Sequence, residues 1–581
     1  MPATVSRASY ALLGLAAAAV CFAAADTYVV VLALPDMMSA SGLGVDELQR
    51  AAPIVSGFLL GYVGILPLVG RISDLRGRLP VLVGTLFVFA LGSVVTAAAY
   101  DLESIVAGRF LQGVGGGGLV PPTLALVADL WPPHRRGLPL GVVGAVQELG
   151  SVLGPVLGAV VLAVADWRAI FWLNTAVGLL LAAGLLQLAG RTRTTEPDET
   201  EPGPRRPWPD VLGAVLLLAA VTALVLTMSP PQRLVEGVDT GRAWLPVDGG
   251  ESKWLTPMAL ALYVLVVLLL VRTATARRPL VQWRGWGDVL RRTDVPGAVL
   301  LCAGLGAVIV SFASAEPESA AISEAAWWLL PLAVVCFVAF AVRQRRAAHP
   351  LVPPGTLADR AAWGAVLVSF FVGASLIAAL VDIPFFARLT IHRDDQVAAA
   401  FVLVRFLVAL PIGAVLGGWL LRRVAPAPLT AVALVLTAGS FAHMATWDRT
   451  ALESPVETLS LVVAGLGFGL ALAPVNAALL ERTPDDVHGV ASGLLVVSRM
   501  VGMLVGISVL TTIGLRAFHD AAEDIPPAEQ LCGGQAAACK AYREAVVDAG
   551  ISQLHAVFVG AAVCAVVAAL LALWVLPRRR A

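Results

Sequence analysis

The composition of this chain identifies the solvent in which it folds. It has 581 residues, of which 58% are hydrophobic and only 14% are charged, with a formal net charge of zero and a mean hydropathy of +0.84. A soluble globular domain is about half apolar and about a quarter charged. These values exclude a soluble protein and indicate an integral membrane protein, and the charge balance gives no sign of a nucleic-acid partner.

Six apolar segments in the first third of the chain are each long enough to span a membrane. The first follows Arg7 and resembles a signal peptide, but its apolar run continues to about Leu34. We therefore expect an uncleaved span rather than a removed leader. The six segments lie near residues 10–34, 51–70, 79–99, 104–130, 138–164 and 167–190.

The next four apolar segments contain an internal repeat. The sequence DVLGAVLLLAA at 210–220 matches DVPGAVLLCAG at 294–304, and ARRPLV at 276–281 matches AAHPLV at 347–352. We interpret this repeat as one two-helix hairpin copied in tandem, and chance similarity between Ala-, Leu- and Val-rich helices is the alternative. The four segments lie near residues 210–228, 255–273, 295–314 and 325–343.

Six final segments bring the number of predicted spans to sixteen. With the N-terminus in the cytoplasm and the spans alternating, most of the 40 Lys and Arg residues fall in cytoplasmic segments, as the positive-inside rule requires. Both termini are then cytoplasmic. The six segments lie near residues 363–387, 396–421, 426–446, 456–480, 489–515 and 551–576.

The sixteen spans divide into two six-helix bundles with four helices inserted between them. An even number of inserted spans leaves the two bundles in the same orientation. The expected parts are an N-terminal bundle at 1–190, a cytoplasmic linker at 191–209, four inserted helices at 210–343, a cytoplasmic loop at 344–362 and a C-terminal bundle at 363–581 that includes an outer loop at 516–550.

The loop after the second span reads GRISDLRGR, from Gly70 to Arg78. Gly77 permits a tight bend there. A charge cluster alone is usually a solvated loop, but this spacing resembles the cytoplasmic signature of the major facilitator superfamily, G-x-x-x-D-x-x-G-R. In that family the Asp and Arg latch the outward-facing state, which implies this role for Asp74 and Arg78. We expect Asp129, at the cytoplasmic end of the fourth span, to join the latch.

Two further motifs agree with this family. RFLQGVGGG, from Arg109, resembles its fourth-helix motif R-x-x-Q-G, and GSVLGPVLG resembles its fifth-helix antiporter motif. Small residues let two helix backbones approach closely, and a proline introduces a bend. Ordinary membrane-helix glycine is the weaker alternative. The candidate hinge residues are Gly150, Gly154, Pro155 and Gly158.

Longer stretches narrow the resemblance. ADTYVVV, AVQELGSVLGP, DWRAIFWLN, ALPIGAVLGGW and SRMVGMLVG look like the fourteen-span drug:proton antiporter group, and most like actinobacterial triacylglyceride exporters that work with a periplasmic lipoprotein. The resemblance implies a monomeric transporter in the bacterial inner membrane, driven by the proton gradient without a cofactor. The duplicated hairpin and the polar 229–254 loop depart from that pattern, which leaves the substrate open.

Charged residues within the predicted spans are the candidate proton-coupling groups, because intramembrane charges are normally functional and paired. A rise of about 1.5 Å per residue converts position into depth. Asp26 and Arg109 share an outer depth, and Glu148 lies near the midplane, as do Arg499 and Arg405. We expect Asp26 to pair with Arg109, and Glu148 to pair with Arg499 or Arg405. The candidates are Glu148, Asp26, Arg499, Arg109, Arg405 and Asp382.

Cysteine and glycine patterns bear on three further features: a disulfide, a metal site and a phosphate-binding loop. Cys532 and Cys539 close a short stretch of the outer loop, and an oxidising compartment then predicts a disulfide. No Cys/His cluster has metal-ligand spacing. GVGGGG lies inside a span and lacks the G-K-[ST] ending of a phosphate-binding loop, so we expect no direct use of ATP.

The function that these features predict is proton-coupled export by alternating access, with a lipid or lipid-like amphiphile such as a triacylglyceride as substrate. A periplasmic lipoprotein is a possible acceptor. A multidrug efflux antiporter is the alternative within transport. A non-transporting membrane scaffold or receptor is the alternative outside transport, and the intramembrane charges and latch motifs argue against it.

Overall fold

The computed structural model describes residues 7–43, 48–192, 210–237, 240–250, 252–276, 286–313, 325–391, 396–526 and 540–578, and these residues form helices and connecting loops without a strand. Fifteen of the described helices are long and apolar enough to cross a membrane. The α11–α12 pair, bent by 62°, makes a sixteenth. The sixteen spans predicted from the sequence agree with this count.

Seven helices form the N-terminal bundle, because its fourth span is broken after Gly117. The glycines of this span bring helix backbones together. A Cβ atom on Gly113 would lie 2.1 Å from the Phe58 carbonyl oxygen, and one on Gly117 would lie 2.2 Å from that of Tyr62. The helices are α1 (Arg7–Ala40), α2 (Leu48–Arg76), α3 (Arg78–Ala97), α4 (Leu102–Gly117), α5 (Val120–Leu130), α6 (Gly137–Val164) and α7 (Trp167–Thr192), with the short η2 (Pro133–Arg135) between α5 and α6.

The inserted helices form two hairpins with the same polar brace. Asp210 and Asp294 each accept a hydrogen bond at 3.0 Å from the backbone N–H three residues later. Arg272 contacts Asp210 at 2.8 Å, and Arg343 contacts Asp294 at 2.6 Å. This repeated brace supports the tandem duplication. The elements are α8 (Val211–Met228), α9 (Gln232–Val235), η3 (Gly241–Trp244), η4 (Lys253–Leu255), α10 (Pro257–Thr275), α11 (Trp286–Arg292), α12 (Val295–Ala313) and α13 (Ala326–Arg346).

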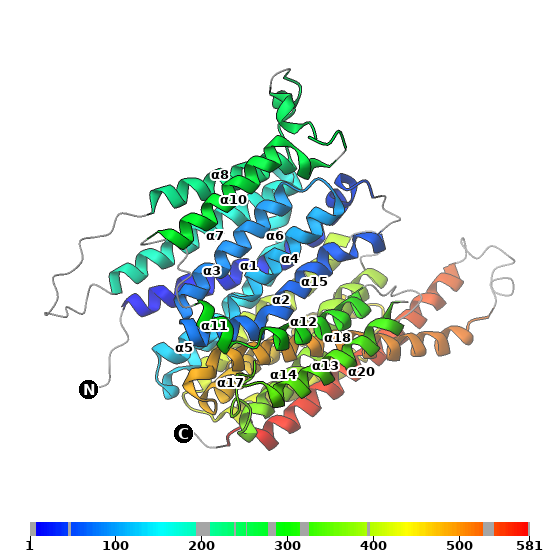
Figure 1. The fold of residues 1–581 in the computed structure, drawn as a ribbon. Helices are drawn as coiled ribbons and strands as arrows, with labels where there is room; N and C mark the ends of the chain where they lie inside the picture. The colour runs from blue at the N-terminus through cyan, green and yellow to red at the C-terminus, as the bar shows by residue number, and fades with distance from the viewer. Residues whose placement is uncertain are drawn as a thin grey trace.

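The C-terminal bundle ends with two long helices, α18 and α20, of 36 residues each. At about 1.5 Å per residue each measures about 54 Å, whereas the hydrocarbon core is about 30 Å thick. Both extend past the other helices at the end away from the chain termini (Figure 1). The elements are α14 (Arg360–Leu389), α15 (Gln396–Leu420), α16 (Pro426–Met444), η5 (Ala451–Glu453), α17 (Pro455–Glu481), η6 (Asp485–Val487), α18 (His488–Glu523) and α20 (Lys540–Val575).

The two hairpins differ in how they pack. α12 packs into the core of the N-terminal bundle, where its Leu301 and Leu305 are buried. By contrast, the α8–α10 hairpin has a small apolar cluster of its own around Ala223 and Leu262. The two hairpins therefore occupy different positions, one built into the bundle and one beside it.

The two bundles meet closely at the end that carries both chain termini, which we call the inner end; the opposite end is the outer end. A Cβ atom on Gly70 of α2 would lie 2.4 Å from the Gly489 carbonyl oxygen of α18. At a second contact between the bundles, a Cβ atom on Gly141 of α6 would lie 2.5 Å from the Ala414 carbonyl oxygen of α15. The bundles are thus closed against each other at the inner end.

Candidate functional site

An ion pair joins the two bundles near the middle of their helices. Glu148 Oε1 on α6 lies 4.0 Å from Arg499 Nη1 on α18, and the side chains are 14% and 11% exposed. Both line a cavity of about 30 Å³, with Gln147 and Asn476 as further polar residues and apolar side chains such as Val372 around them. This volume has room for about two water molecules. A carboxylate here can therefore exchange a proton with water as well as contact its Arg.

The glycines of α6 explain how Glu148 comes to face the cavity. Gly150 packs on α1, where a Cβ atom would lie 2.2 Å from the Cys21 carbonyl oxygen. Gly154 and Gly158 are also buried, and Pro155 lies within the continuous helix. This glycine face fixes the rotation of α6, so that Glu148 points toward the other bundle. The hinge role of these residues stays a prediction.

A second ion pair lies wholly within the N-terminal bundle. Asp26 Oδ2 accepts a hydrogen bond of 2.6 Å from Arg109 Nη1, and both side chains are at most 1% exposed. Gln112 bonds Arg109 at 2.9 Å and Ser93 at 2.8 Å, and the Asn174 amide donates to Asp26. The expected pair is present. Its neutral partners were not predicted from the sequence, where only the Gln of R-x-x-Q-G gave a signal.

Two other candidate residues, Arg405 and Asp382, belong to neither ion pair. Arg405 is exposed and donates to Thr458 Oγ1 at 2.8 Å, so the alternative pairing of Arg405 with Glu148 is wrong. The reason is rotation rather than depth, because Arg405 lies on a face of α15 that points away from α6. Asp382 is half-buried on α14, and it makes no hydrogen bond or ion pair to another described residue.

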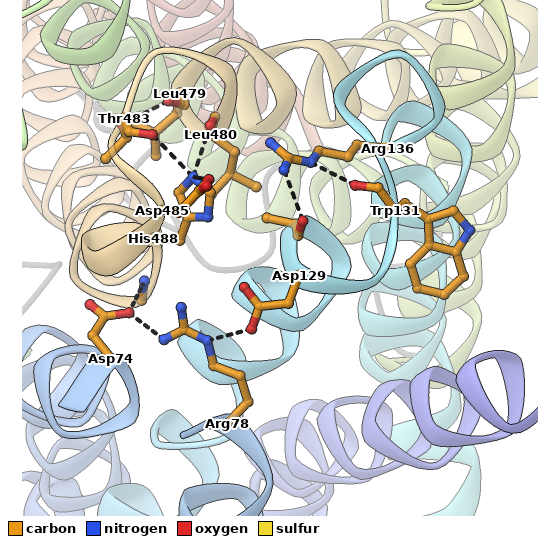
Figure 2. A network of polar contacts seen from close by, with 12 residues as sticks. Asp74, Arg78, Asp129, Trp131, Arg136, Leu479, Leu480, Thr483, Asp485 and His488 are labelled. Carbon is orange, nitrogen blue, oxygen red and sulfur yellow. Dashed lines mark hydrogen bonds and ion pairs between the residues drawn. The ribbon is translucent and has the colours of Figure 1, made fainter. Parts of the chain in front are cut away.

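The inner-end charges form a continuous latch between the bundles (Figure 2). Asp74 contacts Arg78, and Arg78 Nε donates to Asp129 Oδ2 at 3.0 Å. Asp74 also accepts hydrogen bonds from the backbone N–H groups of Gly489 at 2.8 Å and Val490 at 3.0 Å. Gly77 has a φ of +92°, which favours glycine. The predicted latch residues are therefore brought together.

The partner of the latch on the other bundle was not predicted. Asp74 receives the first N–H groups of α18, where a helix N-terminus favours negative charge. The signal in the sequence was RTPDDVHG at 482–489, in which Pro, Asp and Gly indicate a helix start. Nothing in that stretch points to Asp74, because the two lie more than 400 positions apart.

A second inner-end group lies beside the latch (Figure 2). Arg136 is buried and donates to the carbonyl oxygens of Trp131 and Ala128 at 3.0 and 2.8 Å. Burial lowers the pKa of Arg136, although nearby Asp485 opposes this. On the other bundle, His488 Nε2 lies 3.0 Å from the Leu480 carbonyl oxygen. These contacts are local. Arg136 stabilises the α5–α6 connection, and His488 stabilises the α17–α18 connection.

Two further predictions concern a disulfide and metal binding. Cys532 and Cys539 lie outside the described residues, so their disulfide stays a prediction. Among the described residues no group of three or more His, Cys, Asp and Glu side chains could hold a metal ion.

Comparison with known proteins decides the family. The model described as Major Facilitator Superfamily matches residues 16–343. The chain belongs to the major facilitator superfamily. A triacylglyceride transporter of Mycolicibacterium hassiacum is 35% identical over 579 residues, covering 97% of this chain and 91% of that protein. One from Mycolicibacterium smegmatis is 33% identical, covering 96% and 85%.

Solved structures of this superfamily share the fold. The human organic anion transporter MFSD10 has a TM-score of 0.53 at 15% identity, with 97% of this chain and 99% of that chain covered. The transporter FucP in its outward conformation has a TM-score of 0.51 at 15% identity, with 99% and 100% covered. This superfamily member is thus a multi-pass membrane transporter and not an enzyme, and the family resemblance of its motifs is confirmed.

Proposed function

We propose that this chain is a proton-coupled exporter that carries triacylglycerides or similar lipids by alternating access. The observation that carries the proposal is the Glu148–Arg499 contact between the two bundles. When the bundles rock, this pair must change its geometry, whereas a pair within one bundle keeps it. An intramembrane acid between moving bundles can take up a proton in one conformation and release it in the other.

The direction of coupling follows from the two environments of Glu148. Beside Arg499, Coulomb attraction favours the charged carboxylate, and away from Arg499, burial favours the protonated acid. Proton binding therefore favours separation of Glu148 and Arg499, and proton release favours their contact. The latch at the inner end holds the bundles closed there while the pair is formed.

Lipid as the substrate rests on two observations. Relatives that are about one-third identical over most of their length are named triacylglyceride transporters. The wall around Glu148 and Arg499 is mostly apolar, as an apolar cargo requires. A multidrug efflux antiporter would need a similar wall, so the proposed test includes a drug as a second cargo.

The test is transport by the purified chain in liposomes with an imposed proton gradient. Labelled triacylglyceride should move when the gradient is applied, and Glu148→Gln should abolish this movement while leaving insertion and folding intact. Glu457→Gln is the matched control, because Glu457 pairs with His443 near the outer end, away from the cavity. Gradient-driven lipid transport by Glu148→Gln would contradict the proposal, and transport of drug alone would favour the alternative.

The expected setting is the bacterial inner membrane, with both termini cytoplasmic and an acceptor lipoprotein at the outer end. α18 ends at Glu523 and α20 begins at Lys540, so the outer connection is shorter than the 516–550 loop expected from the sequence, and we propose that it passes cargo to the acceptor. Removing residues 525–545 should impair lipid export in cells more than drug efflux.

A cysteine at Ser319 should react from outside with an impermeant reagent in intact cells, and labelling only after permeabilisation would contradict the orientation.

A further inference from the structure

We infer that the inner end carries a binding site for an anionic phospholipid, separate from the cavity that Glu148 and Arg499 line. The observation is a cavity of about 570 Å³ that Tyr10, Leu13, Gly14 and Ala17 of α1 line on one side. The start of α6 and the α5–α6 connection line the rest, and Arg422, just after α15, completes it. Neither Glu148 nor Arg499 lines this site, so its ligand is distinct from the proposed proton-coupling chemistry.

The charges of the cavity select its ligand. Its rim has three basic side chains, His134, Arg135 and Arg422, and the residues lining it include no carboxylate. All three are exposed. Basic pockets between membrane helices on the cytoplasmic side bind phosphate-bearing lipid headgroups. A neutral triacylglyceride has no charge to place at this rim.

The apolar wall fits an acyl chain. Leu13, Ala17 and Val142 line the cavity, and a Cβ atom on Gly14 would meet nothing within 4 Å. Tyr10 and Trp131 meet edge to face with ring centroids 5.5 Å apart, and such aromatic residues mark the level of the headgroups. The headgroup would lie at the Arg residues and one chain would run along α1.

The position of Arg422 links occupancy of this site to the conformation that is closed at the inner end. Arg422 belongs to the C-terminal bundle, whereas the other lining residues belong to the N-terminal bundle. The neighbouring contact of Gly137 with Leu421 and Gly418 closes the bundles at this point. A phosphate held by Arg135 and Arg422 together would therefore stabilise the form that is closed at the inner end.

Native mass spectrometry of the full chain, with phosphatidylglycerol and phosphatidylcholine as probes, tests the site without using transport. Wild type should retain phosphatidylglycerol in preference to phosphatidylcholine. Arg422→Gln should weaken retention by about fivefold, the factor expected for one Arg near an anionic lipid surface. Arg423→Gln is the matched control, because Arg423 instead lies over the Trp419 ring at 5.2 Å and does not line the cavity.

A second variant tests the acyl-chain groove. Gly14→Leu places its Cβ atom in open space, and it should reduce phosphatidylglycerol retention while leaving thermal unfolding unchanged. Equal losses in Arg422→Gln and Arg423→Gln would overturn the site. Equal retention of both phospholipids by wild type would overturn its charge selectivity, and displacement of phosphatidylglycerol by triacylglyceride would make the groove part of the transport route instead.

Discussion

The two intramembrane ion pairs use the same kinds of side chain in different mechanical positions. Asp26 and Arg109 lie 2.6 Å apart within one bundle, fully buried and surrounded by further hydrogen bonds. Glu148 and Arg499 lie 4.0 Å apart on different bundles, beside a cavity. Similar depth along the spans indicated each pair but not whether it joins the two bundles. The two pairs differ in whether both residues belong to one bundle, and we therefore propose a structural role for the first pair and proton coupling for the second.

The largest expected effect is the loss of stability when Asp26 is replaced. Asp26→Ala leaves the Arg109 guanidinium buried without its carboxylate, and breaking a buried pair in this way costs about 3–5 kcal/mol. We expect a clearly lower unfolding temperature and less protein in the membrane, measured by thermal scanning of detergent-purified protein. A variant as stable as wild type would show that Asp26 is not a structural partner.

The second effect separates activity from stability at the other pair. Glu148→Gln keeps the shape of the side chain beside a small wet cavity, so the free energy of unfolding should change by no more than about 1 kcal/mol. Proton-driven transport should nevertheless be lost. A double variant, Glu148→Gln with Arg499→Gln, should be no worse than Glu148→Gln alone in transport. Large destabilisation by Glu148→Gln would remove the distinction between the two pairs.

The third effect concerns the latch, which also joins the two bundles. Asp74→Asn removes a negative charge from the N-terminus of α18, an interaction of about 1 kcal/mol. The population closed at the inner end should fall, as read from distances between spin labels on α2 and α18. Asp129→Asn removes only the partly exposed end of the network and should shift the distances less. Identical distance distributions in all three proteins would contradict the latch.

The smallest effect is expected at Asp382. It lies on one bundle, outside the cavity that Glu148 lines, and it has no ion-pair partner among the described residues. Asp382→Asn should therefore change the free energy of unfolding by no more than about 0.5 kcal/mol and leave proton-driven transport close to wild type. Loss of transport in this variant would make Asp382 a second coupling acid and would weaken the rule that coupling requires a position between bundles.

Local patterns were enough to predict the spans, the family and the latch loop. Apolar runs of about twenty residues must become helices in a membrane, because backbone groups there find partners only within the helix. The glycine at position 77 and the spacing of Asp74 and Arg78 are likewise features of one short stretch of sequence. The repeat of the inserted hairpin was visible as well, whereas the Asp–Arg brace in each hairpin was not predicted from the matching stretches.

Only the tertiary structure decided which of the two candidate arginines meets Glu148. Glu148 reached Arg499 and not Arg405 because helix rotation, fixed by glycine contacts such as Gly150 on α1, sets the direction of each side chain. The sequence gives depth at about 1.5 Å per residue but not rotation against a distant helix. For the same reason the capture of the α18 N-terminus by Asp74 and the separate positions of the two hairpins follow only from packing between segments far apart in the chain.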